Sequence, residues 1–143
     1  MPQLPLRHQQ RQALAWALLR FTLAGLIAAH GLARAWFGAV QPFGLWLQGQ
    51  GWPGGMALAI GITGLEIVGP VLLMLGRWVP PLCLVLAGLY AMGIALVHAQ
   101  AGWFVVGLGR NGSEYSVLLI VCLLALALQH PPSPSSNRKS PTS

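Results

Sequence analysis

Four long apolar segments divide the chain and constrain its fold more than any other feature. They run from about Ala13 to Ala33, Gly55 to Gly76, Trp78 to Ala99, and Ser113 to Gln129. A transmembrane helix needs about 20 largely apolar residues, because the hydrocarbon core of a bilayer is about 30 Å thick. We therefore expect an all-α fold, an integral membrane bundle of four transmembrane helices, in which the fourth helix is the shortest.

The composition supports this class and excludes others. Of the 143 residues, 55% are hydrophobic and 7% are charged, whereas soluble domains carry about 25% charged residues. The net charge of +6 comes from basic residues that are scattered between apolar segments and form no patch or arm. This pattern excludes a nucleic-acid partner and makes the lipid bilayer the expected partner.

Outside the spans, the sequence predicts two polar ends and one irregular connection. Residues 1–12 form an N-terminal segment, 13–130 the transmembrane domain, and 131–143 a Pro- and Ser-rich tail that we expect to be disordered. The connection between the first two spans is rich in Gly, Pro and aromatic residues. We interpret it as a surface or partly re-entrant loop at the membrane interface.

The basic residues indicate an orientation, because Lys and Arg accumulate in cytoplasmic loops. Five of them lie on the side that holds both chain ends, and two lie on the other. The five are Arg7, Arg11, Arg77, Arg138 and Lys139, and the two are Arg34 and Arg110. We expect a multi-pass protein with a cytoplasmic N-terminus and a cytoplasmic C-terminus.

Glu66, one of only two acidic residues in the chain, lies in the middle of the second apolar segment. Counted from the expected cytoplasmic helix ends, Glu66 lies about 15 Å deep and Arg20 of the first segment about 10 Å deep. An unpaired charge in the membrane costs at least about 2.5–3.5 kcal/mol. The sequence therefore predicts an intramembrane ion pair between Arg20 and Glu66, which either braces two helices or forms part of a polar site.

Other residues of the second segment would support Glu66. Thr63 lies one turn earlier and can donate its hydroxyl to the carboxylate. Pro70 has no N–H, so the carbonyl of Glu66 loses its helical partner. Gly61, Gly64 and Gly69 would let another helix approach closely.

A second polar group is expected near the opposite membrane face. It includes His30 and His98 near the ends of the first and third segments, with Trp103, Glu114 and Tyr115 before or within the fourth. These residues would form a pocket for a ligand or quinone. Equally, the histidines can be structural, and Glu114 can be a helix N-terminal charge that pairs with Arg110. The histidines and cysteines show no metal-ligand spacing, so we expect no metal site.

Three segments together resemble a known family. They are "LLRFTLAGLIAAHGLARAWFG", "ITGLEIVGPVLLMLGRWV" and "HAQAGWFVVGLGRNGSEYSVLLI", and they carry Arg20, His30-Gly31, Glu66, Arg77 and Gly112-x-Glu114-Tyr115. This order closely resembles the DoxX family of small bacterial integral membrane proteins, over about residues 13–130. The resemblance implies a four-helix protein of the bacterial inner membrane. Some relatives are subunits of quinone-linked oxidoreductases, but the family supplies no agreed catalytic residues.

Two functions from different classes follow. The first is a quinone-interacting subunit of a membrane oxidoreductase complex, with a membrane or soluble redox protein as partner, because the sequence holds no haem, flavin or iron–sulfur motif of its own. The alternative is a non-catalytic membrane scaffold or accessory subunit. A small transporter ranks last, because the polar residues do not form a continuous column. Glycine-lined helix faces are compatible with a homodimer, and the sequence assigns no catalytic residue.

Overall fold

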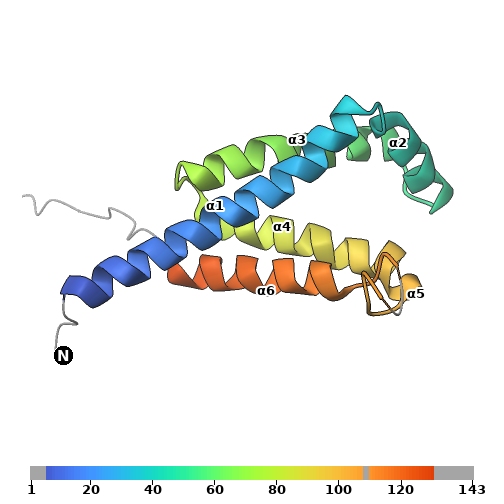
Figure 1. Ribbon diagram of the computed structural model, residues 1–143. Coiled ribbons are helices and arrows are strands. Elements are labelled where there is room, and N and C mark those ends of the chain that lie inside the picture. Colours follow the sequence, from blue (N-terminus) through green and yellow to red (C-terminus); the bar gives the residue numbers. More distant parts are fainter. Residues whose placement is uncertain (1–5, 108–109, 131–143) are drawn as a thin grey trace, which may run out of the picture.

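The computed structural model describes residues 6–107 and 110–130, which form helices and connecting turns without any strand (Figure 1). The elements in chain order are α1 (Leu6–Trp36), α2 (Val40–Gly49), α3 (Gly55–Met74), α4 (Val79–Gly93), the π-helical turn η1 (Ile94–His98), α5 (Ala99–Ala101) and α6 (Glu114–Gln129). The expected tail 131–143, with Arg138 and Lys139, lies outside the described residues, as do residues 1–5.

Three helical stretches are long and apolar enough to cross a membrane. They are Arg7–Trp36, Gly55–Met74 and the continuous stretch Val79–Ala101 formed by α4, η1 and α5. The fourth apolar helix, α6, has 16 residues and spans about 24 Å. Together with the family assignment given below, these helices confirm the all-α membrane bundle, including its short fourth helix.

The connection between the first two spans differs from the expectation. Instead of an irregular loop, it contains the ten-residue helix α2, which packs against α3. Pro42 does not interrupt this helix because it lies in the first turn, where the backbone N–H has no helical acceptor. Glycine and proline in the sequence therefore obscured a short helix.

The four long helices are arranged as two pairs. Figure 1 shows α1 lying along α3 and α4 lying along α6, and the contacts within each pair far exceed those between the pairs. We call the end of the bundle with the α3–α4 turn (residues 75–78) and the end of α6 the turn end. The end with α2 and η1 is the cavity end.

The apolar core lies between the pairs and extends from the turn end. It consists of Leu23, Ala24, Ile27, Leu73, Val79, Cys83, Leu86, Ala87, Leu119, Leu123 and Leu126. Large apolar side chains on the outer helix faces remain exposed, as expected for surfaces that contact lipid rather than water. Toward the cavity end the core gives way to polar side chains.

The register between α1 and α3 fixes which polar residues can meet. Gly31 lies against Glu66, and the antiparallel direction then places Arg34 at the level of Thr63. Eleven residues back along α1, the guanidinium of Arg20 lies beside Gly76 in the α3–α4 turn. The first turns of α1 therefore extend beyond the turn end of α3.

Candidate functional site

Glu66 forms an ion pair with Arg34 and not with Arg20. The Nη1 atom of Arg34 donates to Oε2 of Glu66 at 2.5 Å, and the side chain of Glu66 is only 4% exposed. This is the one salt bridge among residues 6–107 and 110–130. The predicted Arg20–Glu66 pair is therefore wrong, although the prediction that the intramembrane carboxylate has an arginine partner is correct.

The error came from assuming that neighbouring helices end at the same level. Arg20 lies opposite the α3–α4 turn, while Glu66 lies opposite Gly31, about 16 Å further along α1. That separation exceeds the reach of an arginine side chain. Arg34 is only one turn beyond Gly31, so its side chain reaches back to Glu66 directly.

Further contacts hold Arg34 in place. Its Nη1 atom also donates to Oγ1 of Thr63 at 3.3 Å, and its guanidinium lies 4.6 Å from the centre of the Phe43 ring of α2. Thr63 donates its own hydroxyl to the carbonyl of Ala59 at 2.7 Å. Thr63 thus supports the arginine as an acceptor, rather than donating to Glu66 as the sequence had suggested.

A glycine of α1 permits this pairing. A Cβ atom at Gly31 would lie 2.9 Å from the Cβ of Glu66, so a larger residue would push α1 away from α3. Gly61 and Gly64 of α3, which we expected to allow a close approach, have nothing within 4 Å of such an atom, and Gly69 has only ordinary contacts. The close contact between the helices therefore depends on Gly31 of α1.

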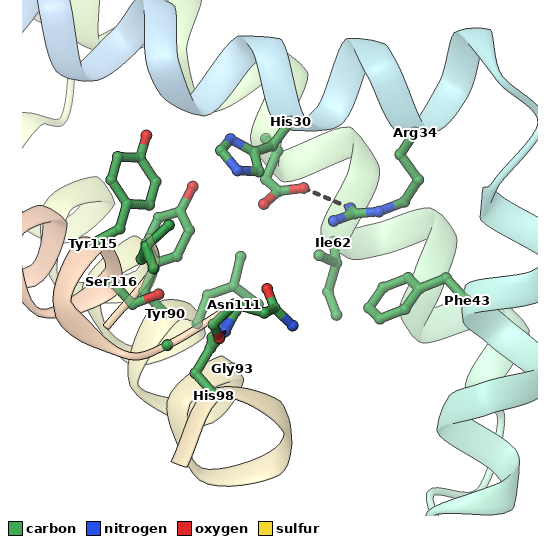
Figure 2. A pocket seen from close by; sticks show the side chains of 14 residues that line it. His30, Arg34, Phe43, Ile62, Tyr90, Gly93, His98, Asn111, Tyr115 and Ser116 are labelled. Carbon is green, nitrogen blue, oxygen red and sulfur yellow. Dashed lines mark hydrogen bonds and ion pairs between the residues drawn. The ribbon is translucent and has the colours of Figure 1, made fainter. Parts of the chain in front are cut away.

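The ion pair faces a cavity of about 270 Å³ at the cavity end (Figure 2). All four long helices, α2, η1 and the 102–113 loop contribute to its walls. The lining residues are His30, Arg34, Phe43, Ile62, Glu66, Leu89, Tyr90, Gly93, His98, Val105, Asn111, Gly112, Tyr115 and Ser116. Glu66 and three residues of the expected second polar group, His30, His98 and Tyr115, thus lie around one space rather than at two separate depths.

Backbone carbonyls orient both histidine rings. The Nδ1 atom of His30 lies 2.9 Å from the carbonyl oxygen of Leu26, and Nδ1 of His98 lies 2.7 Å from that of Asn111. A carbonyl oxygen only accepts, so in the neutral rings Nδ1 carries the proton and Nε2 remains as an acceptor. Tyr115 stacks on His30 with ring centroids 6.1 Å apart.

Two residues of the expected pocket do not line this cavity. Oε1 of Glu114 accepts a hydrogen bond from the backbone N–H of Val105 at 2.9 Å, and the N–H of Glu114 donates to the carbonyl of Trp103. Glu114 therefore anchors the 102–113 loop onto the start of α6, and the Trp103 side chain is exposed. A Cβ at Gly112 would overlap the carbonyl oxygens of this loop, which explains the glycine two residues before Glu114.

Four residues of this site were not predicted from the sequence: Arg34, Tyr90, Asn111 and Ser116. The hydroxyl of Tyr90 is buried and has no hydrogen-bond partner in the described part of the chain. In Figure 2, Tyr90 lies beside Tyr115 on the wall across from Arg34. A tyrosine within an otherwise apolar span was a usable signal, because a buried hydroxyl normally finds a partner.

The fold and the cavity together define a class: a small helical membrane protein with a buried ion pair at the edge of a polar cavity. The DoxX family matches residues 15–99, which is more than half of the chain, and the chain therefore belongs to the DoxX family. The match includes Arg20, His30-Gly31, Glu66 and Arg77 but ends before the Gly112-x-Glu114-Tyr115 motif. No curated protein and no solved structure matches the chain.

Proposed function

We propose that this protein binds the head group of a membrane quinone in the polar cavity and acts as a quinone-interacting subunit of a membrane oxidoreductase complex. The observation that carries the proposal is the unpartnered hydroxyl of Tyr90, buried in the wall of a cavity that also contains the Arg34–Glu66 pair. Buried polar groups normally have partners. A ligand acceptor would satisfy this hydroxyl.

The chemistry of the cavity suits a compact ligand with carbonyl oxygens. Tyr90 and Ser116 offer hydroxyl donors, and Arg34 offers a cation whose charge is already balanced by Glu66. Small-molecule pockets usually have volumes of about 300–1,000 Å³. A cavity of about 270 Å³ is at the lower limit, which favours a single-ring head group over a large cofactor such as haem.

An adjoining apolar cavity supports a ligand with a hydrocarbon tail. It has a volume of about 80 Å³ and shares Phe43, Ile62, Leu89 and Gly93 with the polar cavity. Its remaining walls are apolar and come from Trp46, Leu47, Met92, Leu96 and Val97. The first isoprene unit of a tail would lie here while the ring occupies the polar cavity.

The π-helical turn η1 contributes to the walls of both the polar and the apolar cavity. Leu96 and Val97 line the apolar cavity, whereas His98 lines the polar one. Single π-helical turns within α-helices occur frequently at functional sites. In this chain, successive side chains of the turn therefore line the apolar cavity and the polar cavity, which together would form an amphiphilic site.

Reduction of a quinone to a quinol requires two electrons and two protons, and the chain carries no motif for an electron-transfer cofactor. The proposed role therefore requires a redox protein as a partner, in the membrane or in solution, that supplies the electrons. The DoxX protein would hold the quinone at the point where such a partner docks.

The test measures binding of a short-chain ubiquinone to the purified protein in nanodiscs. Tyr90→Phe removes only the unpartnered hydroxyl and should weaken binding about tenfold, as expected for one lost hydrogen bond with some desolvation. Trp103→Phe is the matched control, because Trp103 is exposed and does not line the cavity. Equal binding by wild type and Tyr90→Phe would reject the proposed site.

The alternative is a non-catalytic accessory subunit, and one observation favours it. Trp36 and Phe37, at the corner between α1 and α2, are 86% and 80% exposed. They suit either a protein partner or the membrane interface, where aromatic residues are enriched. A protein that binds no quinone but retains a defined partner, and loses it in a Trp36→Ala/Phe37→Ala variant, would establish this second function.

We also infer location in the bacterial inner membrane with both termini cytoplasmic. Arg7, Arg11 and Arg77 belong to the turn end, whereas Arg34 and Arg110 belong to the cavity end, and Lys and Arg accumulate on the cytoplasmic side. Labelling of Gln10→Cys and Trp103→Cys variants with a membrane-impermeant maleimide tests this orientation. In intact cells only Trp103→Cys should react, and the opposite pattern would reverse the topology.

A further inference from the structure

Arg20 has no counter-ion among residues 6–107 and 110–130. Glu66 and Glu114 are the only acidic side chains in the chain, and both are engaged elsewhere, with Arg34 and with the N–H of Val105. The guanidinium of Arg20 contacts the Phe21 ring at 5.5 Å, but its Nε atom is buried without a partner among the described residues. A buried charged donor of this kind requires an acceptor.

The position of Arg20 indicates where that acceptor comes from. α3 has 20 residues and therefore spans about 30 Å, the thickness of the hydrocarbon core. Arg20 lies beside Gly76, just beyond the end of α3. Its guanidinium therefore lies near the boundary between hydrocarbon and head groups, where lipid phosphates are found.

Arg20 also lines a cavity of its own at the turn end, between α1 and the end of α6. This cavity has a volume of about 250 Å³, and its other walls come from Ala13, Trp16, Ala17, Gln129 and His130. The small side chains of Ala13 and Ala17 leave the space open. Trp16 and Gln129 add N–H groups that can donate to an anion, whereas Nδ1 of His130 lies 3.4 Å from the carbonyl oxygen of Leu126.

The surrounding surface is suited to acyl chains. Leu14 and Leu18 of α1 are 70% exposed, and Leu128 near the end of α6 is 86% exposed. These apolar side chains lie close in sequence to the residues that line the cavity. A phospholipid with its phosphate in the cavity could therefore lay its chains along the outer faces of α1 and α6.

We propose that Arg20 and the cavity between α1 and the end of α6 bind a phosphate group, that of an anionic phospholipid. The guanidinium forms the charge-assisted hydrogen bonds, in the geometry that makes arginine the usual partner of phosphate. Trp16 and His130 border the phosphate, and the lipid neutralises the cation that residues 6–107 and 110–130 leave unpaired. This site is separate from the polar cavity and does not depend on quinone binding.

Native mass spectrometry of protein released from nanodiscs tests the proposal. The wild-type chain should retain phosphatidylglycerol in preference to phosphatidylcholine, and Arg20→Gln should reduce this retention at least about tenfold. Arg7→Gln is the matched control, because it removes the same charge from an exposed position of the same helix. Equal retention by wild type and Arg20→Gln would overturn the proposal.

A second variant covers the case in which Arg20→Gln does not fold. Ala17→Phe keeps the charge but fills the cavity, so it should also lose phosphatidylglycerol, and full retention would contradict the assigned position of the phosphate. Added inorganic phosphate distinguishes the two sources of the anion. Displacement of the lipid by inorganic phosphate at low concentration would keep the phosphate site but reject the lipid as its occupant.

Discussion

A half-buried arginine lies at each end of this bundle, and the two have opposite surroundings. At the cavity end, Arg34 has a carboxylate, a hydroxyl and an aromatic ring around it. At the turn end, Arg20 has an aromatic contact but no anion among the described residues. The difference shows that charge pairing in this chain follows helix register, because the single intramembrane carboxylate can satisfy only the arginine at its own level.

The same comparison applies to packing. In the apolar core between the helix pairs, large side chains such as Leu73, Leu86 and Leu126 are fully buried. At the cavity end, polar residues line a space that protein atoms do not fill. The first region resembles a structural core, and the second has the features of a ligand site.

The largest expected effect comes from breaking the ion pair at the cavity end. Arg34→Met leaves a buried carboxylate unpaired and should lower the free energy of unfolding by about 3–5 kcal/mol. Arg20→Met should change it by less than about 1 kcal/mol in lipid-free detergent, because no described residue pairs with Arg20. Denaturant unfolding of both variants, each alone and with Glu66→Leu, measures the coupling energies. Coupling of Glu66 to Arg20 rather than to Arg34 would contradict the observed register.

Gly31→Ala should lower the free energy of unfolding somewhat less than Arg34→Met does. The new Cβ would lie 2.9 Å from the Cβ of Glu66, and overpacking of this kind costs about 1–3 kcal/mol. Gly25→Ala is the control on the same helix, because a Cβ there meets nothing within 4 Å. That control should be neutral or stabilising by up to about 1 kcal/mol, since alanine favours helix. Equal thermal stabilities of the two variants would show that the close approach of α1 to α3 is not needed.

Tyr90→Phe should raise the stability of the quinone-free protein but weaken its binding of quinone. The hydroxyl is buried without a partner, so its removal should raise the free energy of unfolding of the quinone-free protein by about 1 kcal/mol. Added quinone should stabilise the variant less than the wild type, because binding to the native state adds stability in proportion to occupancy. Thermal unfolding with and without quinone measures both quantities. A destabilised quinone-free variant would show that the hydroxyl already has a partner.

The smallest effect on stability is expected from substitutions of Glu114, which holds the 102–113 loop. Glu114→Gln keeps an oxygen acceptor for the N–H of Val105 and should cost less than about 1 kcal/mol, whereas Glu114→Ala removes the acceptor and should cost about 1.5–3 kcal/mol. Hydrogen exchange at Val105 checks this directly. Faster exchange in Glu114→Ala but not in Glu114→Gln is the expected result, and unchanged exchange in both would mean that the bond is not formed.

The sequence by itself determined the class, the four long apolar helices and the presence of a critical charge, but not the short helix α2. Apolar segments of membrane-spanning length dictate helices, because a backbone in hydrocarbon must satisfy its own hydrogen bonds. The isolated Glu66 required a cationic partner for the same solvation reason. Of the five residues expected to share a pocket, His30, His98 and Tyr115 line the cavity, whereas Trp103 and Glu114 do not.

Only the tertiary structure decided which arginine meets Glu66 and which side chains share the cavity. The relative sliding of α1 along α3 is set by the contact of Gly31 with Glu66, and hydropathy carries no information about such a shift because the apolar segments have no sharp ends. Tyr90 and Ser116 come from helices that pack mainly against each other, so their approach to Arg34 depends on how the two helix pairs diverge. Local sequence determines which side chains each helix carries. Packing between distant segments determines which residues those side chains contact.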